Sequence, residues 1–156
     1  MVNRLVVLLS TLLLASCSGN RVFEQNESLP NAVWQVNDIK SFSFQVPDTT
    51  RQYNVLFNIR SSADYDYQNL FFSYMLKNAS GTVLDSALVE ENLFDPITGK
   101  PLGQGFGNYS DLQIPIITNT RFTDTGSYQL NLQQFMRTES LAGVVSVGAR
   151  VEVVAP

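Results

Sequence analysis

The chain has 156 residues, of which 44% are hydrophobic and 15% are charged, a composition typical of one globular domain. Its 10 basic and 14 acidic residues give a net charge of −4, which argues against nucleic-acid binding. The chain has no His and one Cys, so it has no disulfide framework and few of the usual catalytic or transition-metal constellations.

The first sixteen residues predict an export signal. Arg4 precedes an apolar run from Leu5 to Ala15, which is 11 residues long. A membrane-spanning helix needs about 20 residues, so cleavage is the better interpretation. Leu14-Ala15-Ser16-Cys17 resembles a bacterial lipobox, in which cleavage precedes the Cys and lipid is attached to it. We therefore expect a lipoprotein signal peptide over residues 1–16 and lipidation of Cys17.

The segment after the cleavage site is polar and shows no sustained apolar period. It predicts that residues 17–31 are the lipidated Cys and a tether, followed by a folded domain over residues 32–156. Ser18 resembles the sorting signal of outer-membrane lipoproteins, and no acidic residue precedes Glu24. We expect a protein that is lipid-anchored in the outer membrane and faces the periplasm.

Alternating apolar and polar residues predict β-strands through the rest of the chain. The expected inward positions are Phe42, Phe44 and Val46; Tyr53, Val55, Phe57 and Ile59; Leu70, Phe72, Tyr74 and Leu76; Leu112, Ile114 and Ile116; Tyr128, Leu130 and Leu132; and Val147, Ala149, Val151 and Val153. Turn residues at 78–81 predict a hairpin over residues 69–91. Four Gly and two Pro predict a long loop over residues 95–107, and a short helical turn is expected over 134–142.

These elements predict an all-β fold, an antiparallel β-sandwich of about seven or eight strands. Asp124-Thr125-Gly126-Ser127-Tyr128 resembles the corner of immunoglobulin-like domains, where the Tyr hydroxyl bonds to the upstream backbone. The topology stays open between an immunoglobulin-like and a jelly-roll arrangement.

The acidic residues offer no specific catalytic or metal-binding pattern. Asp64 and Asp66, with Asp38 or the Glu90-Glu91 pair, could hold Ca²⁺, but EF-hand spacing is absent and solvated loop acids are the preferred interpretation. A glycoside hydrolase would need two carboxylates about 5 to 9.5 Å apart in a cleft. We expect no metal, no cofactor and no catalysis.

Aromatic residues are numerous, and most are expected in the core. A sugar-stacking surface could draw on Trp34, Tyr53, Tyr65, Tyr67, Phe71, Phe72 and Tyr74. Phe71 falls on the opposite strand face from Leu70 and Phe72. Together with Leu56, Met75, Leu84 and Leu88, it indicates an outer face that is not fully polar, covered either by more of the fold or by a partner.

Short segments along the chain share the pattern of one family. They are the lipobox at Cys17, Trp34, Phe42-Ser43-Phe44, Tyr53-Asn54, Asn58-Ile59-Arg60, Tyr65-Asp66-Tyr67-Gln68-Asn69-Leu70, the Gly-rich residues 99–107, Phe135-Met136-Arg137, Leu141-Ala142-Gly143 and Val147-Gly148-Ala149-Arg150. They resemble the GldH gliding-motility lipoproteins of the Bacteroidetes from Phe23 to Val153. Asp66 departs from the family pattern, where Pro is expected.

The resemblance implies a lipoprotein needed for gliding motility, working beside the type IX secretion machinery and its partner lipoproteins, with no catalytic residue. We predict a non-enzymatic interaction module that is anchored to the membrane through Cys17 and binds other envelope or motility lipoproteins. Its expected contact residues are Tyr65, Tyr67, Asn69 and Phe106. The alternative is a carbohydrate-binding lipoprotein of a glycan-uptake system. For Arg60, Arg137 and Arg150, buried ion pairing is preferred over a docking role.

Overall fold

The structure is a computed structural model that describes residues 19–155, so the predicted signal peptide and the predicted lipidation site Cys17 lie outside the described residues. The described residues form eleven β-strands and one short 3₁₀ helix, η1 (Pro30–Ala32). Within this part of the chain, no helix is long and apolar enough to cross a membrane.

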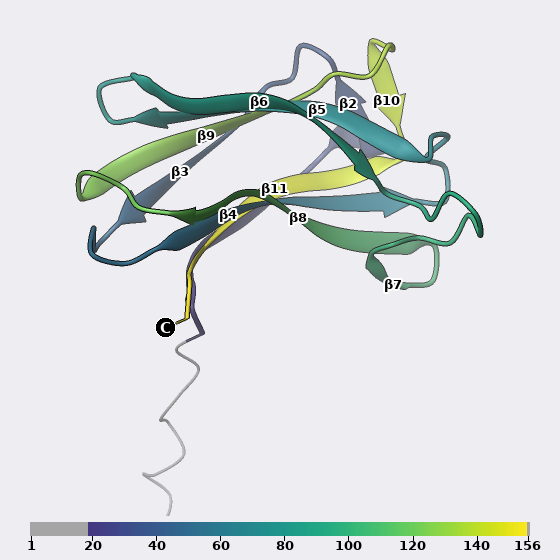
Figure 1. The fold of residues 1–156 in the computed structure, drawn as a ribbon. Coiled ribbons are helices and arrows are strands. Elements are labelled where there is room, and N and C mark those ends of the chain that lie inside the picture. The colour runs from purple at the N-terminus through teal and green to yellow at the C-terminus, as the bar shows by residue number, and fades with distance from the viewer. Residues whose placement is uncertain (1–18, 156) are drawn as a thin grey trace, which may run out of the picture.

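Two antiparallel sheets are stacked face to face (Figure 1). The first sheet contains, in spatial order, β1 (Arg21–Ser28), β11 (Val144–Val153), β4 (Tyr53–Ser62), β8 (Tyr109–Thr120) and β7 (Gln104–Phe106). The second contains β3 (Lys40–Val46), β9 (Gly126–Gln134), β5 (Asn69–Asn78) and β6 (Val83–Asn92). A small ribbon is made of β2 (Val33–Gln35) and β10 (Ser140–Ala142). The predicted all-β sandwich is confirmed.

Eight of the strands form four antiparallel pairs, in which an early strand pairs with a late one. Counted inward from the two ends of the chain, β1 pairs with β11, β3 with β9, β4 with β8, and β5 with β6. This pairing alternates between the two sheets and is the connectivity of a jelly roll. The structure therefore decides between the two predicted topologies, and the three short strands are additions to the jelly roll.

The core lies between the two sheets and contains the predicted inward positions. Every second residue of β3 is buried, and the same alternation continues along β5 and β9. Phe57 of the first sheet and Phe72 of the second meet with ring centroids 4.5 Å apart. Burying such a side chain contributes about 1.5 to 3 kcal/mol, so this aromatic contact is a main link between the sheets.

The predicted tyrosine corner is present. The Tyr128 hydroxyl donates a hydrogen bond to the backbone carbonyl of Asp124 at a distance of 2.8 Å. Because the topology is a jelly roll, this hydrogen bond stabilises the turn before β9 and does not identify an immunoglobulin-like fold.

The prediction of a tether up to residue 31 is wrong. Residues 21–28 form β1, which pairs with β11 along its length. The half-buried Phe23 lies against Phe44 of the second sheet, with ring centroids 6.0 Å apart. An edge strand is held largely by its backbone, so its side chains need not alternate, and the polar sequence of this segment concealed it.

The helical turn expected over residues 134–142 is also wrong. The segment bends and then forms β10, which pairs with β2 through Leu141 and Trp34. The long loop over residues 95–107 is present, but its last part forms β7 against β8.

Candidate interaction surface

The loop between β4 and β5 is organised around a buried tyrosine. Tyr65 is only 6% exposed, and its ring is stacked on Phe94 at a centroid distance of 6.2 Å. Its hydroxyl donates a hydrogen bond to the Asn69 carbonyl at 2.8 Å, and burial raises the pKa of this hydroxyl. Gly143 has a φ of 80°, and a Cβ there would lie 2.4 Å from the Tyr65 nitrogen, so only glycine fits beside this loop.

Two of the predicted contact residues therefore hold the loop, and a third is presented by it. Asn69 donates a side-chain hydrogen bond to Glu90 across the β5–β6 pair. Tyr67 is 43% exposed and packs edge-on against Tyr65, with ring centroids 5.9 Å apart. Tyr65 and Asn69 thus fix the backbone from which Tyr67 projects.

The Gly-rich loop is pinned at its base and exposes an apolar tip. The Asp95 carboxylate accepts hydrogen bonds from the backbone N–H groups of Thr98 and Ile97 and from the Thr98 hydroxyl, and these bonds lower its pKa. The Asp95 N–H donates to the Lys100 carbonyl at 2.8 Å. Ile97, at the tip, is 91% exposed.

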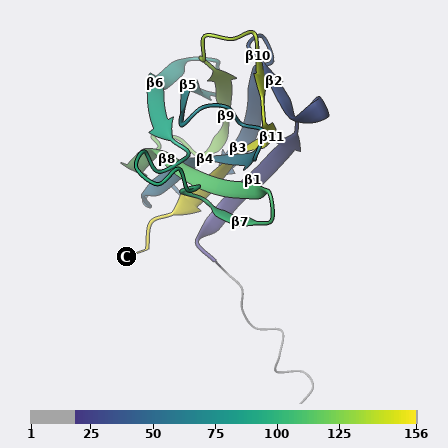
Figure 2. The same ribbon diagram turned by 90° about the vertical axis from the view of Figure 1, so that its right-hand side faces the viewer.

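The hairpin of β7 and β8 lies beside these loops. The Ala63 N–H donates a hydrogen bond to the Asn108 carbonyl at 3.0 Å, which joins the hairpin to the chain just before Tyr65. Phe106 of β7 is 95% exposed. We call this region the loop end, defined by its exposed apolar side chains Tyr67, Ile97, Leu102, Phe106 and Tyr109. Figure 2 views the molecule from this side.

The loop end is far from the start of the domain. Tyr53, at the start of β4, pairs with Val153, whose N–H donates to the Asn20 carbonyl. Ser62, at the other end of β4, pairs with Tyr109. A ten-residue strand is roughly 30 Å long. The described chain therefore begins at one end of the sandwich and exposes these apolar side chains at the other.

Most of the aromatic residues considered for sugar stacking are in the core. Trp34, Tyr53, Tyr65, Phe72 and Tyr74 are buried. Tyr67 alone of the seven is largely exposed, and Phe71 is half-buried. Within residues 19–155, no group of three or more His, Cys, Asp or Glu side chains is placed to hold a metal ion.

The three arginines differ from one another. Arg60 forms a two-bond pair with Asp111, Nε to Oδ1 and Nη2 to Oδ2, both at 2.8 Å, and Asp111 raises the pKa of Arg60. This pair is about half exposed, so the expectation that it is buried is wrong. Arg150 pairs with Glu152 in a partly buried position. Arg137 forms no ion pair with any residue that the structure describes.

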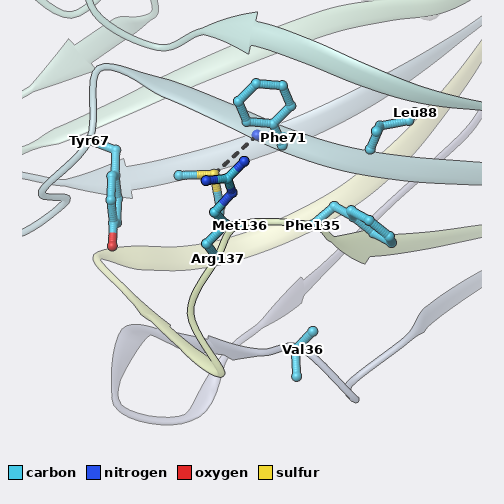
Figure 3. A pocket seen from close by; sticks show the side chains of 7 residues that line it. All are labelled: Val36, Tyr67, Phe71, Leu88, Phe135, Met136 and Arg137. Carbon is cyan, nitrogen blue, oxygen red and sulfur yellow. Dashed lines mark hydrogen bonds between the residues drawn. The ribbon is translucent and has the colours of Figure 1, made fainter.

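The outer face of the second sheet is partly apolar, as predicted. Met75, Leu84 and Leu88 are exposed on it, whereas Leu56 is buried on the first sheet. Near the loop end this face has a hollow bordered by Phe135, Met136 and Arg137 (Figure 3). The sequence pattern did not reveal this hollow, because a helical turn was expected at these three residues.

Comparison with known proteins decides the family. Residues 21–151 match the family described as GldH lipoprotein. The chain belongs to the GldH lipoprotein family. The gliding motility lipoprotein GldH homolog of Christiangramia forsetii is 30% identical to it, over 94% of this chain and 93% of the relative. The gliding motility lipoprotein GldH of Flavobacterium johnsoniae is also 30% identical, over 94% of both chains.

The likeness of this GldH family member to solved structures is weak. An arabinose-bound α-L-arabinofuranosidase aligns with a TM-score of 0.39 and 11% identity, over 83% of this chain and 19% of the enzyme. Similarity at this level says nothing about what the chain does.

Proposed function

We propose that the protein is a non-enzymatic interaction module, anchored by lipid in the outer membrane and facing the periplasm, that acts in the envelope machinery of gliding motility and type IX secretion. Membership of the GldH lipoprotein family supports the process. The observation that carries the molecular role is the loop end, where Ile97 and Phe106 are almost fully exposed on pinned loops.

An exposed apolar side chain on an ordered loop is costly to keep in water and inexpensive to bury against a partner. The hydrogen bonds around Asp95 and the β7–β8 pairing already fix these loops, so binding would cost little further conformational entropy. Aromatic anchors of this kind carry most of the binding energy in protein interfaces. The loop end thus supports a protein partner, and we expect another envelope or motility lipoprotein.

The carbohydrate-binding alternative has weaker support. A sugar-stacking platform needs exposed aromatic rings on one face together with polar groups for the hydroxyls. Trp34 and Tyr65, the central members of the suggested platform, are buried. Only Tyr67 of that set offers a largely exposed ring.

Cross-linking in envelopes tests the proposal. The wild-type lipoprotein and an Ile97→Ala, Phe106→Ala variant are tagged, cross-linked and purified, and the recovered proteins are identified by mass spectrometry. We expect the wild type to recover motility or secretion lipoproteins and the variant to lose most of them. Leu84→Ala, which removes an exposed apolar side chain from β6, is the matched control and should keep them.

Either of two results would refute the proposed role. One is recovery of the same lipoproteins by the double variant, which would move the contact away from the loop end. The other is the absence of any envelope protein together with binding on a glycan array, which would favour the carbohydrate alternative. Tyr67 is left unchanged in this test because it also borders the hollow on the second sheet.

A further inference from the structure

The hollow on the outer face of the second sheet has the size and lining of a binding site. Its volume is about 640 Å³, within the usual range for ligand sites. Its walls include Tyr67, Phe71, Leu88, Phe135 and Met136, and Arg137 lies among them (Figure 3). Almost all of this lining is apolar, which suits apolar side chains better than a sugar.

One wall of the hollow is fixed by a buried amide. Gln134 is completely buried; its Oε1 accepts a hydrogen bond from the Met136 N–H at 2.8 Å, and its Nε2 donates to the Thr138 carbonyl at 2.9 Å. The Phe135 N–H donates to the Phe71 carbonyl at 2.8 Å. Phe135 itself is 56% exposed, so an aromatic ring projects from a backbone that is already ordered.

The positive charge of Arg137 indicates that the occupant of the hollow carries a negative charge beside its apolar groups. Arg51, Arg121 and Arg137 have no carboxylate partner among the described residues, and of these three only Arg137 borders the hollow. Arg137 is itself exposed at the edge of the hollow, where its guanidinium can bind both oxygens of a carboxylate whose neighbours pack on the apolar wall.

The position of the hollow limits the source of its occupant. Phe71 lies near the start of β5 and Phe135 directly follows β9, and both positions are near the loop end. Cys17 precedes the start of β1 by four residues, which reach at most about 14 Å, whereas β4 alone is roughly 30 Å long. The lipid attachment site therefore lies away from the hollow, and the membrane reaches the hollow only if the domain lies flat on it, an orientation that the quenching experiment in the Discussion tests.

A second copy of the chain is also disfavoured. Removal of Arg4 with the signal peptide leaves 9 basic residues against 14 acidic ones, a net charge of −5. Like net charge opposes the association of two copies, although salt screens this repulsion beyond about 8 Å. We therefore take a different protein as the source of the occupant, and the test below keeps a second copy as an outcome that would overturn this choice.

We propose that the hollow binds an extended apolar segment of a partner protein that carries one carboxylate. The carboxylate pairs with Arg137, and the flanking apolar side chains pack on Phe71, Phe135 and Met136. This inference rests on the proposed function, since it assigns the chemistry of a partner to the same interaction module.

Binding of defined peptides tests the proposal. The probe is a mixture of acetylated, amidated hexapeptides in which Leu, Ile or Phe flank a single Glu, and the matched mixture has Gln in place of Glu. The purified lipoprotein is held in phosphatidylcholine nanodiscs, with empty nanodiscs as the reference. We expect the Glu mixture to bind about fivefold more tightly than the Gln mixture. Arg137→Gln should abolish this preference, and Arg137→Lys should keep part of it.

The two methionine methyl groups of the mature chain report where the peptides bind. Met136 borders the hollow, and Met75 is exposed elsewhere on the same sheet, while Met1 leaves with the signal peptide. With ¹³C-methyl labelling, we expect the Met136 resonance to move on addition of the Glu mixture and the Met75 resonance to stay. Arg121→Gln changes an exposed arginine outside the hollow and should leave binding unchanged.

Equal affinity for the two peptide mixtures, or no affinity for either, would overturn the proposal. Movement of the Met136 resonance with protein concentration alone would also overturn it, in favour of a second copy. These results leave the loop-end cross-linking unaffected, so failure of this inference and failure of the proposed function are distinguishable.

Discussion

At the end of β9, hydrogen bonds from one buried side chain fix the path of the backbone. The alternation along β9 places Gln134 at an inward position, where a pattern of apolar residues would simply stop. Its side-chain amide instead forms hydrogen bonds with the Met136 N–H and the Thr138 carbonyl, which have no strand partner there. Hydropathy cannot show this, because a buried amide looks like a break in the pattern until its partners are known.

Replacing this amide should destabilise the fold. Gln134→Leu keeps the volume but leaves the Met136 N–H and the Thr138 carbonyl without partners, at a cost of about 2 kcal/mol. The free energy of unfolding is measured by urea titration, with the fluorescence of the single Trp as the signal. Gln129→Leu, on the opposite face of the same strand, should change it by less than about 0.5 kcal/mol. Equal losses in the two variants would show that the amide has no special role.

Tyr74 gives the fold a pH dependence at the alkaline end. Burial, followed by the hydrogen bond that its hydroxyl donates to Asp85 at 3.0 Å, raises the pKa of Tyr74 from 10 to about 12. Between these values the unfolded chain loses the phenolic proton and the folded chain keeps it, so the free energy of unfolding falls as the pH rises.

Substitution isolates this contribution. In Tyr74→Phe, we expect the free energy of unfolding to fall less steeply between pH 10 and pH 12 than in the wild type. Asp85→Asn removes the charged acceptor but keeps the burial, and its slope should be intermediate. Urea titrations at several pH values measure the slopes, and identical slopes for all three proteins would contradict the assignment.

At the scale of elements, the strands that the sequence reveals are those with one face in the core. β3, β5 and β9 alternate clearly because each has one face in the core and the other toward solvent. β4 and β11, in the interior of the first sheet, are apolar and buried at most of their positions. β6 is exposed on nearly all its positions and was found through the turn that joins it to β5. β1 shows neither a regular alternation nor a short turn to a neighbouring strand. Its pairing with β11 joins the two ends of the chain, which no local pattern can indicate.

A substitution in β1 distinguishes a strand from a tether. Phe23→Ala removes the contact with Phe44 and should lower the free energy of unfolding by about 1 to 2 kcal/mol, less than for a fully buried Phe because the side chain is only half-buried. Gln25→Ala, at an exposed position of the same strand, should have almost no effect. If both variants were as stable as the wild type in urea, β1 would contribute nothing to the fold.

At the scale of the whole molecule, the candidate surface depends on which loops meet. The sequence marked Tyr67 and Phe106, but they are about forty residues apart, and only the jelly-roll pairing places their loops at one end. The same pairing places Phe135 beside Phe71. Composition could not reveal these neighbours, because they follow from strand register and not from local pattern.

The short connection between Cys17 and β1 predicts how the domain stands on a membrane. With only residues 18–20 between them, the end of the sandwich that contains Asn20, Arg51 and Val153 should touch the lipid headgroups. The loop end, roughly one strand length of 30 Å away, should then point into the aqueous phase, where a partner can reach it.

Fluorescent labels at the two ends test this orientation. Cys17 is the sole cysteine, and the lipid that we propose on its sulfur would block its thiol, so Arg51→Cys and Ile97→Cys each give one reactive thiol. In vesicles with a quencher attached to the headgroups, we expect strong quenching of the label at residue 51 and little at residue 97, relative to vesicles without quencher. Equal quenching would mean that the sandwich lies flat on the bilayer. Ile97 and Phe106 would then face lipid, and their exposure would reflect membrane contact in place of a protein partner.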